Sequence, residues 1–187
     1  MTAGYAETTL RQLAAAVGMK AGSIYHHFAS KDEIFEAILV RGIDVMVQSF
    51  HSVSVGSDPL PLLHAHIRAH LGSLFEHGPY TAVHVTSFRS APATVRDRIV
   101  LVRDGYEALW TGLLQSLATS GEIDIDASVA MTRLILFGSM NSSLEWFHPH
   151  GDQSVDDLAN AITGQFWSGV RPPQGPGQPL PPRRDTP

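Results

Sequence analysis

Hydrophobic residues recur at helical spacing through most of this 187-residue chain. Apolar side chains at positions i, i+3, i+4 and i+7 lie on one face of an α-helix. The positions that keep this spacing are Leu10, Leu13, Ala14 and Val17; Phe35, Leu39, Ile43, Met46 and Phe50; Leu60, Leu63, Ile67, Leu71 and Leu74; Val95, Ile99, Val102, Tyr106, Leu109, Leu113 and Leu117; Ala130, Leu134, Phe137, Asn141 and Leu144; and Val155, Leu158, Ile162 and Phe166. The sequence shows no convincing strand alternation. The pattern therefore predicts an all-α fold.

Residues that cap or break helices mark the ends of several of these stretches. Gly78-Pro79 ends the third stretch and Ser120-Gly121 ends the fourth. Asp126 is a candidate cap for the fifth helix, and either Ser154 or Asp152 for the last, because their side chains accept hydrogen bonds from backbone N–H groups.

A short helix from about Lys20 to His27 is expected to follow the first helix, which runs from about Thr8 to Val17. A turn at Gly18 joins them with the spacing of a helix-turn-helix, whose second helix enters the major groove of DNA while the first braces it. Ile24 and Phe28 are four residues apart and would hold the short helix inward. Its glycine, Gly22, costs roughly 1 kcal/mol relative to alanine, which is understandable if the backbone approaches DNA closely.

The start of the next helix offers a second contact to DNA. Ser30 and Glu33 have the spacing of a capping box, so a helix is expected to begin at Lys31. A helix N-terminus carries free N–H groups and a partial positive charge, which suit a phosphate. The hydroxyls of Thr8 and Thr9 offer a further phosphate contact at the bracing helix.

The composition limits the classes of protein to which the chain can belong. The formal net charge is −5, so any attraction to DNA must come from a local patch. The chain contains no cysteine, which excludes disulfides and thiolate chemistry. No apolar run approaches the roughly 20 residues that a bilayer requires. We therefore expect a cytoplasmic protein without a membrane span.

The C-terminal residues 171–187 have a different composition, since seven of the seventeen are proline. Proline removes a backbone donor and fixes φ, so neither helix nor sheet is expected there. We predict a disordered tail.

Residues 4–39 resemble the DNA-binding segment of the TetR family of transcriptional regulators. The matching residues are Thr8-Thr9, Gly18, the run Gly22-Ser23-Ile24-Tyr25-His26-His27-Phe28, and Ser30-Lys31. The resemblance implies a DNA-binding domain over residues 1–45 and a helical ligand-binding and dimerisation domain over 46–170. It also implies contact with double-stranded operator DNA through Thr8, Thr9, Lys20, Ala21, Gly22, Ser23, Tyr25, His26 and Lys31.

Two features depart from the family's pattern. Its members usually carry a helix of about twenty residues before the position of Gly4-Tyr5, whereas only three residues precede it here. The first helix of the DNA-binding domain is therefore expected to be missing. Ala21 also stands where many relatives have a larger or charged residue, so the base preference of those relatives does not transfer.

Other candidate chemistry is weaker. His66 and His70 in the run "HAHIRAH" are four residues apart and could bind zinc, but no acidic third ligand lies on the same turn. We interpret His64, His66 and His70 as polar residues on a helix face. The sequence has no Gly-x-Ser-x-Gly elbow. We expect no enzymatic activity, no metal and no cofactor.

The larger domain carries aromatic residues and a few hydrogen-bond donors between its apolar stripes, a composition typical of pockets for small organic ligands. Ordinary core packing explains most of the aromatic residues equally well. The candidates are Tyr80, His84, Phe88, Arg89, Trp110, Arg133, Phe137, Asn141 and Trp146. The stretch "NSSLEWFHPHG", residues 141–151, is similar to a pattern in TetR subgroups that often sense acyl-CoA thioesters.

These observations favour a ligand-responsive repressor, released from its operator by a small hydrophobic or acyl-type effector, with acyl-CoA among the candidates. The alternative is a regulator that binds a ligand or partner without binding DNA. The last two long helices are expected to form the homodimer, because Gly138, Ser139, Ser142 and Ser143 permit close approach.

Overall fold

The computed structural model describes residues 5–125, 128–170 and 172. Within them it contains helices and no strand, which confirms the predicted all-α fold. The described residues form two short 3₁₀ helices, η1 and η2, and eight α-helices. In chain order the elements are η1 (Tyr5–Glu7), α1 (Leu10–Ala16), α2 (Ala21–His27), α3 (Lys31–His51), α4 (Pro59–Phe75), α5 (Pro79–Ser87), η2 (Phe88–Ser90), α6 (Ala93–Thr119), α7 (Val129–Trp146) and α8 (Val155–Val170). The candidate cap Asp126 and the predicted tail, apart from Pro172, lie outside the described residues.

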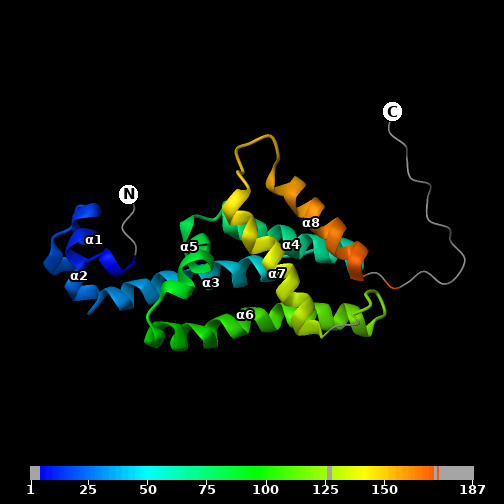
Figure 1. The fold of residues 1–187 in the computed structure, drawn as a ribbon, viewed down its shortest axis with the longest axis horizontal. Helices are drawn as coiled ribbons and strands as arrows, with labels where there is room; N and C mark the ends of the chain where they lie inside the picture. Colours follow the sequence, from blue (N-terminus) through cyan, green and yellow to red (C-terminus); the bar gives the residue numbers. More distant parts are fainter. Residues whose placement is uncertain (1–4, 126–127, 171, 173–187) are drawn as a thin grey trace, which may run out of the picture.

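A small head and a larger helical bundle share the long helix α3 (Figure 1). The head contains η1, α1, α2 and the first turns of α3, and its core consists of Leu10, Ala14 and Ile24 with Leu13 and Ile34 against them. α3 then continues into the bundle without a break at residue 45, where the sequence suggested a domain boundary. One continuous helix therefore joins the head to the bundle.

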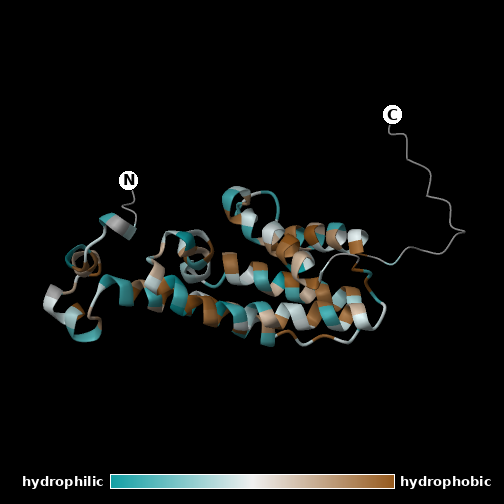
Figure 2. Cartoon of the chain, turned by 60° about the horizontal axis from the view of Figure 1, so that its bottom comes forward, coloured by the Kyte–Doolittle hydropathy of each residue, from teal (hydrophilic) through white to brown (hydrophobic). Residues whose placement is uncertain are grey.

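The core of the bundle is built from the apolar faces of α3, α4, α6, α7 and α8. Hydrophobic residues recur along these helices in Figure 2. The largest side chains that are fully buried include Leu39, Ile43, Leu63, Ile67, Leu71, Trp110, Leu114, Leu136 and Met140. α3 packs against α4, α5 and α6, and α8 lies against α4.

The sequence pattern did not predict α5. Its buried residues are Thr81 and His84, which are both polar, so the helix has no apolar stripe to recognise. α5 lies directly on α3 at Gly42, where a Cβ atom would be 2.6 Å from the backbone oxygen of Tyr80 and 2.8 Å from the Cβ of His84. Gly42 is thus the residue that lets the two helices approach so closely.

The sequence analysis predicted the wrong buried face for α7. The residues buried in this helix are Thr132, Leu136, Met140 and Ser143, whereas Leu134 is 53% exposed and Ala130 is also exposed. The helix carries apolar residues on two faces, and only one of them packs against the bundle. The other face exposes Met131, Leu134 and Ile135.

The interpretation of three histidines on α4 as polar surface residues is wrong for two of them. His66 and His70 are buried, and His64 is half-buried. His66 packs against Phe50, with 4.1 Å between ring centroids, and His70 stacks on Tyr106 and Phe137. Leu60 and Val102, predicted to lie on buried faces, are exposed.

Serine and threonine side chains cap four of the helices. Ser30 accepts the N–H of Glu33, so α3 begins at Lys31 as predicted. Ser154 accepts the N–H of Asp157 at the start of α8, which confirms the first of its two candidate caps. Ser128 caps α7 by accepting the N–H of Met131. Burial of the apolar faces and these caps together explain where the helices begin.

Candidate DNA-binding head and ligand cavity

The two short helices of the head have the geometry of a helix-turn-helix. Gly18 lies in the turn with φ +69, a left-handed conformation that favours glycine. Ile24 of α2 is buried against Leu10 and Ala14 of α1, as its spacing predicted, while Phe28 is half-buried. The opposite side of α2 therefore faces away from the head.

Most of the predicted DNA contacts lie on the exposed surface of α2. Tyr25 is 57% exposed, and Lys20, Gly22 and His26 are also exposed. Nothing lies within 4 Å of the position a Cβ would take at Gly22, so the backbone is open to an approaching surface. Ser23 is half-buried, and the side chain of Ala21 is outside the described part.

Thr9 caps the bracing helix α1, a role that the sequence analysis did not predict. Thr9 is the N-cap of α1, where its Oγ1 accepts the Gln12 N–H at 3.3 Å and its own N–H donates to Gln12 Oε1 at 2.8 Å. The Thr9 hydroxyl also donates to Gln12 Oε1. Its capacity for hydrogen bonds is therefore largely used within α1. Thr8 is half-buried beside it.

The ammonium group of Lys31 is held by Tyr5. Lys31 Nζ donates to the Tyr5 carbonyl at 3.1 Å and lies 4.5 Å from the centre of its ring. Tyr5 in turn donates its hydroxyl to Asp32 and stacks on Phe35, with 4.5 Å between centroids. Burial, with a smaller effect of Asp32, raises the pKa of Tyr5 to about 12. This side chain, which the sequence interpretation did not single out, fixes η1 to the start of α3.

The start of α3 is less open to an anion than its sequence suggested. The N–H of Glu33 donates to Ser30, and the carboxylate of Glu33 accepts the N–H of Ala29 at 2.6 Å. Asp32 adds a second carboxylate in the first turn. Side chains of the protein itself therefore already compensate part of the positive charge at the start of α3.

A cavity of about 600 Å³ lies within the bundle. α5, η2, α6 and α7 supply most of its lining, with Met46 from α3 and His70 from α4. Five predicted ligand-binding residues line it, namely His84, Phe88, Arg89, Phe137 and Asn141. Residues that the sequence interpretation did not name also line it, among them His70, Arg103, Tyr106, Glu107 and Glu145.

The other four predicted ligand-binding residues lie elsewhere. Trp110 is fully buried in the core, where it meets Phe50 and Phe137 edge to face. Tyr80 is partly exposed on α5 and is not part of the lining. Arg133 pairs with Glu107 and lines a different hollow on the bundle.

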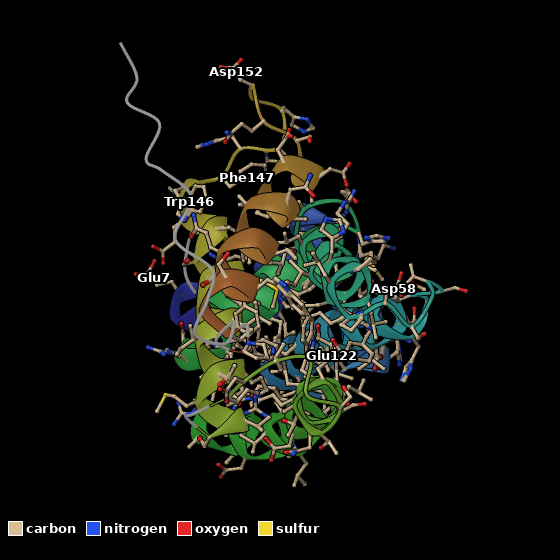
Figure 3. The ribbon with its side chains drawn as sticks, turned by 90° about the vertical axis from the view of Figure 1, so that its right-hand side faces the viewer. Glu7, Asp58, Glu122, Trp146, Phe147 and Asp152 are labelled. Carbon is tan, nitrogen blue, oxygen red and sulfur yellow. The ribbon has the colours of Figure 1, made fainter. Side chains whose placement is uncertain are left out.

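Trp146 is also outside the cavity. It is 55% exposed at the end of α7, next to the buried Phe147 and close to the loop that carries Asp152 (Figure 3).

A hydrogen-bonded row of three side chains crosses one side of the cavity. His70 Nδ1 is 2.7 Å from the Tyr106 hydroxyl, and its Nε2 is 3.0 Å from Asn141 Oδ1. With the amide oxygen of Asn141 as acceptor, Nε2 carries the proton and the Tyr106 hydroxyl donates to Nδ1. Burial lowers the pKa of His70 to about 4, so the ring is neutral at physiological pH. The row links α4, α6 and α7.

His84 gives the cavity a second neutral imidazole. Burial, with a smaller effect of Arg103, lowers its pKa to about 4. The ring lies 5.9 Å from that of Phe88, and its Nδ1 has no hydrogen-bond partner in the part of the chain that the structure describes. His84 also forms part of the contact between α5 and Gly42. One residue therefore belongs both to the cavity wall and to the helix that presses on α3.

Three charged side chains meet where α6 and α7 cross. Glu107 lies between two guanidinium groups, with its Oε1 3.1 Å from Arg103 Nε and its Oε2 2.6 Å from Arg133 Nη2. Arg133 Nη1 also donates to the Glu107 carbonyl at 3.2 Å and to Thr111 Oγ1 at 2.9 Å. Arg103 covers the Phe88 ring at 4.8 Å from its centre.

A second hollow, of about 650 Å³, lies where the head meets α5. Its apolar lining includes Leu13, Ile34, Ile38 and Val83, so these residues are only partly covered. The expectation of a missing first helix concerns sequence before Tyr5, outside the described residues.

The described residues hold no group of three or more histidine, cysteine, aspartate or glutamate side chains placed to bind a metal ion. Within the same residues, none of the helices combines the length and hydropathy needed to cross a membrane.

Comparison with known proteins places both parts of the chain in one family. Residues 1–38 match the model described as bacterial regulatory proteins, tetR family, and residues 56–170 match the tetracyclin repressor-like C-terminal domain. The chain is 24% identical over 172 residues to the HTH-type transcriptional repressor KstR2 of Rhodococcus jostii, covering 91% of this chain and 84% of that protein.

Two further relatives extend the comparison. The fatty acid metabolism regulator protein of Bacillus subtilis is 23% identical, over 89% of this chain and 87% of that protein. The structure of AibR in complex with isovaleryl coenzyme A and operator DNA has the same fold, with a TM-score of 0.71 and 19% identity, covering 86% of this chain and 88% of AibR.

Proposed function

Because this chain belongs to the TetR family of DNA-binding transcriptional regulators, which are not enzymes, we propose that it is a repressor released from its operator by a small effector. The effector is hydrophobic or acyl-type, with acyl-CoA thioesters as the first candidates. The exposed face of α2 reads the major groove, with Lys20, Tyr25, His26 and Lys31 near the phosphates.

One observation carries the proposal: α5 lines the cavity and also packs directly on α3 at Gly42. His84 lines the cavity, and its Cβ would be 2.8 Å from a Cβ at Gly42. From Gly42, α3 runs back to its first residue, Lys31. Its N-cap, Ser30, lies shortly after the end of the reading helix α2 at His27. An effector that displaces α5 changes the position of α3 and hence of the head, because packed helices shift as units.

The lining of the cavity supports an acyl-type ligand. Met46, Val85, Phe88, Phe137 and Leu144 supply an apolar wall, and His70, Tyr106 and Asn141 supply a few fixed polar groups. Such a mixture of apolar surface and few polar groups is typical of sites for small organic ligands. Two relatives, the fatty acid metabolism regulator protein and AibR in its complex with isovaleryl coenzyme A, support the same class.

We propose that the active form is a homodimer joined through α7 and α8. α7 exposes Met131, Leu134 and Ile135 in one apolar stripe, beside the small residues Gly138, Ser139 and Ser142. Exposed apolar stripes of this kind are usual at helix-to-helix interfaces between subunits. A two-fold dimer places two reading helices in successive major grooves, about 34 Å apart.

The proposal is tested by measuring DNA binding before and after adding effector. Selection of bound sequences from a random duplex library with the purified chain yields an operator, and fluorescence anisotropy then measures its affinity. We expect acyl-CoA thioesters of suitable chain length to weaken binding by tenfold or more, whereas coenzyme A alone does not. If the chain binds no selected duplex more tightly than random-sequence DNA, the proposed repressor function is wrong.

A further inference from the structure

The charged cluster at the crossing of α6 and α7 has more positive than negative charge. Arg103 and Arg133 share the single carboxylate of Glu107. The cluster is partly buried, since the side chains of Arg133 and Glu107 are 14% and 17% exposed. Asp104, the nearest acidic residue in sequence, is solvent-exposed and makes no ion pair among the described residues. A net positive charge in such a place favours an anion.

The two arginines differ in how fully they are satisfied. Arg133 is anchored by the Glu107 carbonyl and Thr111 in addition to the carboxylate, although its own buried Nε has no hydrogen-bond partner in the described part either. Arg103 has the 3.1 Å ion pair alone, and its buried Nε has no hydrogen-bond partner in the described part, because the N–H is not aligned with the carboxylate. Buried donors without an acceptor are costly, so an acceptor is expected to complete the group.

Arg103 is also the member of the cluster that reaches the cavity. It lines the cavity together with Glu107 and lies over the ring of Phe88, whereas Arg133 is outside the lining. The other lining arginine, Arg89, is exposed on η2 and makes no ion pair within the described ranges. The carboxylate of Glu145 also lines the cavity, and no ion pair joins it to Arg103 among the described residues.

We propose that Arg103 binds an anionic oxygen group of the effector, so that the ligand replaces the missing second carboxylate of the cluster. The apolar part of the ligand then lies against Phe88, Phe137 and Met46. This inference rests on the proposed function of the cavity and adds the chemical class of its polar end. The anionic group is the carboxylate of a free acid or a phosphate of a coenzyme A thioester.

The test uses three probes that share one acyl chain, decanoic acid, decanoyl-CoA and the uncharged methyl decanoate. Their affinities are measured by the change in intrinsic tryptophan fluorescence, since the buried Trp110 contacts Phe137 of the lining. The variant Arg103→Gln is expected to lose about tenfold in affinity for an anionic probe and to leave methyl decanoate unchanged. The variant Glu107→Gln is expected to change the anionic affinity in the opposite direction, because it increases the positive excess.

The matched control is Arg98→Gln on the same helix. Arg98 is exposed, pairs with Glu36 and does not line the cavity, so its loss is expected to change no affinity. If Arg103→Gln lowers the affinity for decanoic acid alone, the anion of the ligand is a carboxylate. If it lowers the affinity for decanoyl-CoA alone, the anion is a phosphate. Either result supports the proposal.

Two outcomes would overturn the proposed anion site, and only the second would also overturn the acyl-type effector. If methyl decanoate binds and Arg103→Gln changes all three probes equally or none, the anion site is wrong while the cavity remains a ligand site. If the wild-type chain binds none of the probes, both the anion site and an acyl-type effector are wrong.

Discussion

The backbone oxygen of Tyr80 lies so close to Gly42 that a Cβ atom there would be 2.6 Å away. Neither residue was expected to matter for the link between cavity and head. Backbone atoms cannot rotate away as a side chain does, so even one methyl group at Gly42 must separate α3 from α5.

We expect Gly42→Ala to weaken the response of DNA binding to effector and to destabilise the fold by about 1 to 3 kcal/mol, because overpacking forces the helices apart. Urea denaturation and operator anisotropy measure the two effects. Gly112→Ala is the matched control, since nothing lies within 4 Å of its position on the exposed side of α6. That change is expected to stabilise the helix by up to about 1 kcal/mol. An unchanged response in Gly42→Ala would disprove the coupling through α5.

The hydroxyl of Tyr25 is expected to bind a phosphate of the operator. Tyr25→Phe removes one neutral hydrogen bond, so affinity falls about three- to tenfold for specific and random duplexes alike. The salt dependence of binding stays the same, because no charge is lost. Anisotropy titrations at several salt concentrations measure both quantities. Tyr80→Phe, also a partly exposed tyrosine, serves as control and leaves DNA affinity unchanged. A loss confined to the specific duplex would instead assign Tyr25 to a base.

The dimer is tested at Ile135, which is 60% exposed on α7. Ile135→Glu places a charge in the proposed interface, which costs several kcal/mol when it is buried without a partner. Light scattering at micromolar concentration is expected to change from dimer to monomer. Leu101→Glu makes the same change at a residue that is 76% exposed on α6 and leaves the dimer intact. A wild-type chain that is monomeric under these conditions would contradict the interface.

The buried histidines predict how stability depends on pH. The pKa of His70 and that of His84 fall from 6.5 to about 4 in the folded protein, so between these values the unfolded chain binds more protons than the folded one. Stability is therefore highest above pH 6.5 and decreases as the pH falls toward 4. At pH 5 each group costs roughly 2 kcal/mol relative to pH 8.

Urea denaturation of the wild-type chain and of His70→Gln at pH 5 and pH 8 measures the contribution of one histidine. Glutamine can keep a hydrogen bond to Tyr106 or Asn141 without titrating. We expect a smaller difference between the two pH values in the variant. Equal differences in both proteins would show that His70 is not the group responsible.

The head is expected to open more readily than the bundle. Among the described residues, its buried core consists of Leu10, Ala14 and Ile24, whereas α6 contributes to a much larger buried cluster. Amides of residues 9–28 should therefore exchange with solvent much faster than those of 95–117. Hydrogen exchange measured by mass spectrometry tests this directly. Similar protection in the two regions would mean that another surface, such as a second chain, covers the hollow beside Leu13 and Ile34.

Helical spacing alone predicted every long helix, because each one buries an apolar stripe. It failed where burial does not follow that rule. α5 buries the polar residues Thr81 and His84, so no apolar stripe marks it. α7 is apolar on two sides, so the pattern could not show which side of α7 faces the core. His66 and His70 are polar by residue type, yet aromatic neighbours from other helices surround them.

The candidate site was predicted in part for the same reasons. Phe88, Phe137 and Asn141 line the cavity, but Trp110 fills the core, since a sequence does not distinguish a lining aromatic residue from a packed one. Arg103 and Glu107 are four residues apart, the spacing of a common surface ion pair on a helix, so the sequence does not single them out. Only the approach of Arg133 from α7 shows that their charges are unbalanced.

The length of α3 has a further geometric consequence. Lys31 is eleven residues from Gly42, so the helix forms an arm of about 16 Å between them. Tilting that arm by about 10° at Gly42 moves its end by about 3 Å, close to the 3.4 Å rise between neighbouring base pairs. A small rotation inside the bundle is therefore enough to move the reading helix by one step along the DNA.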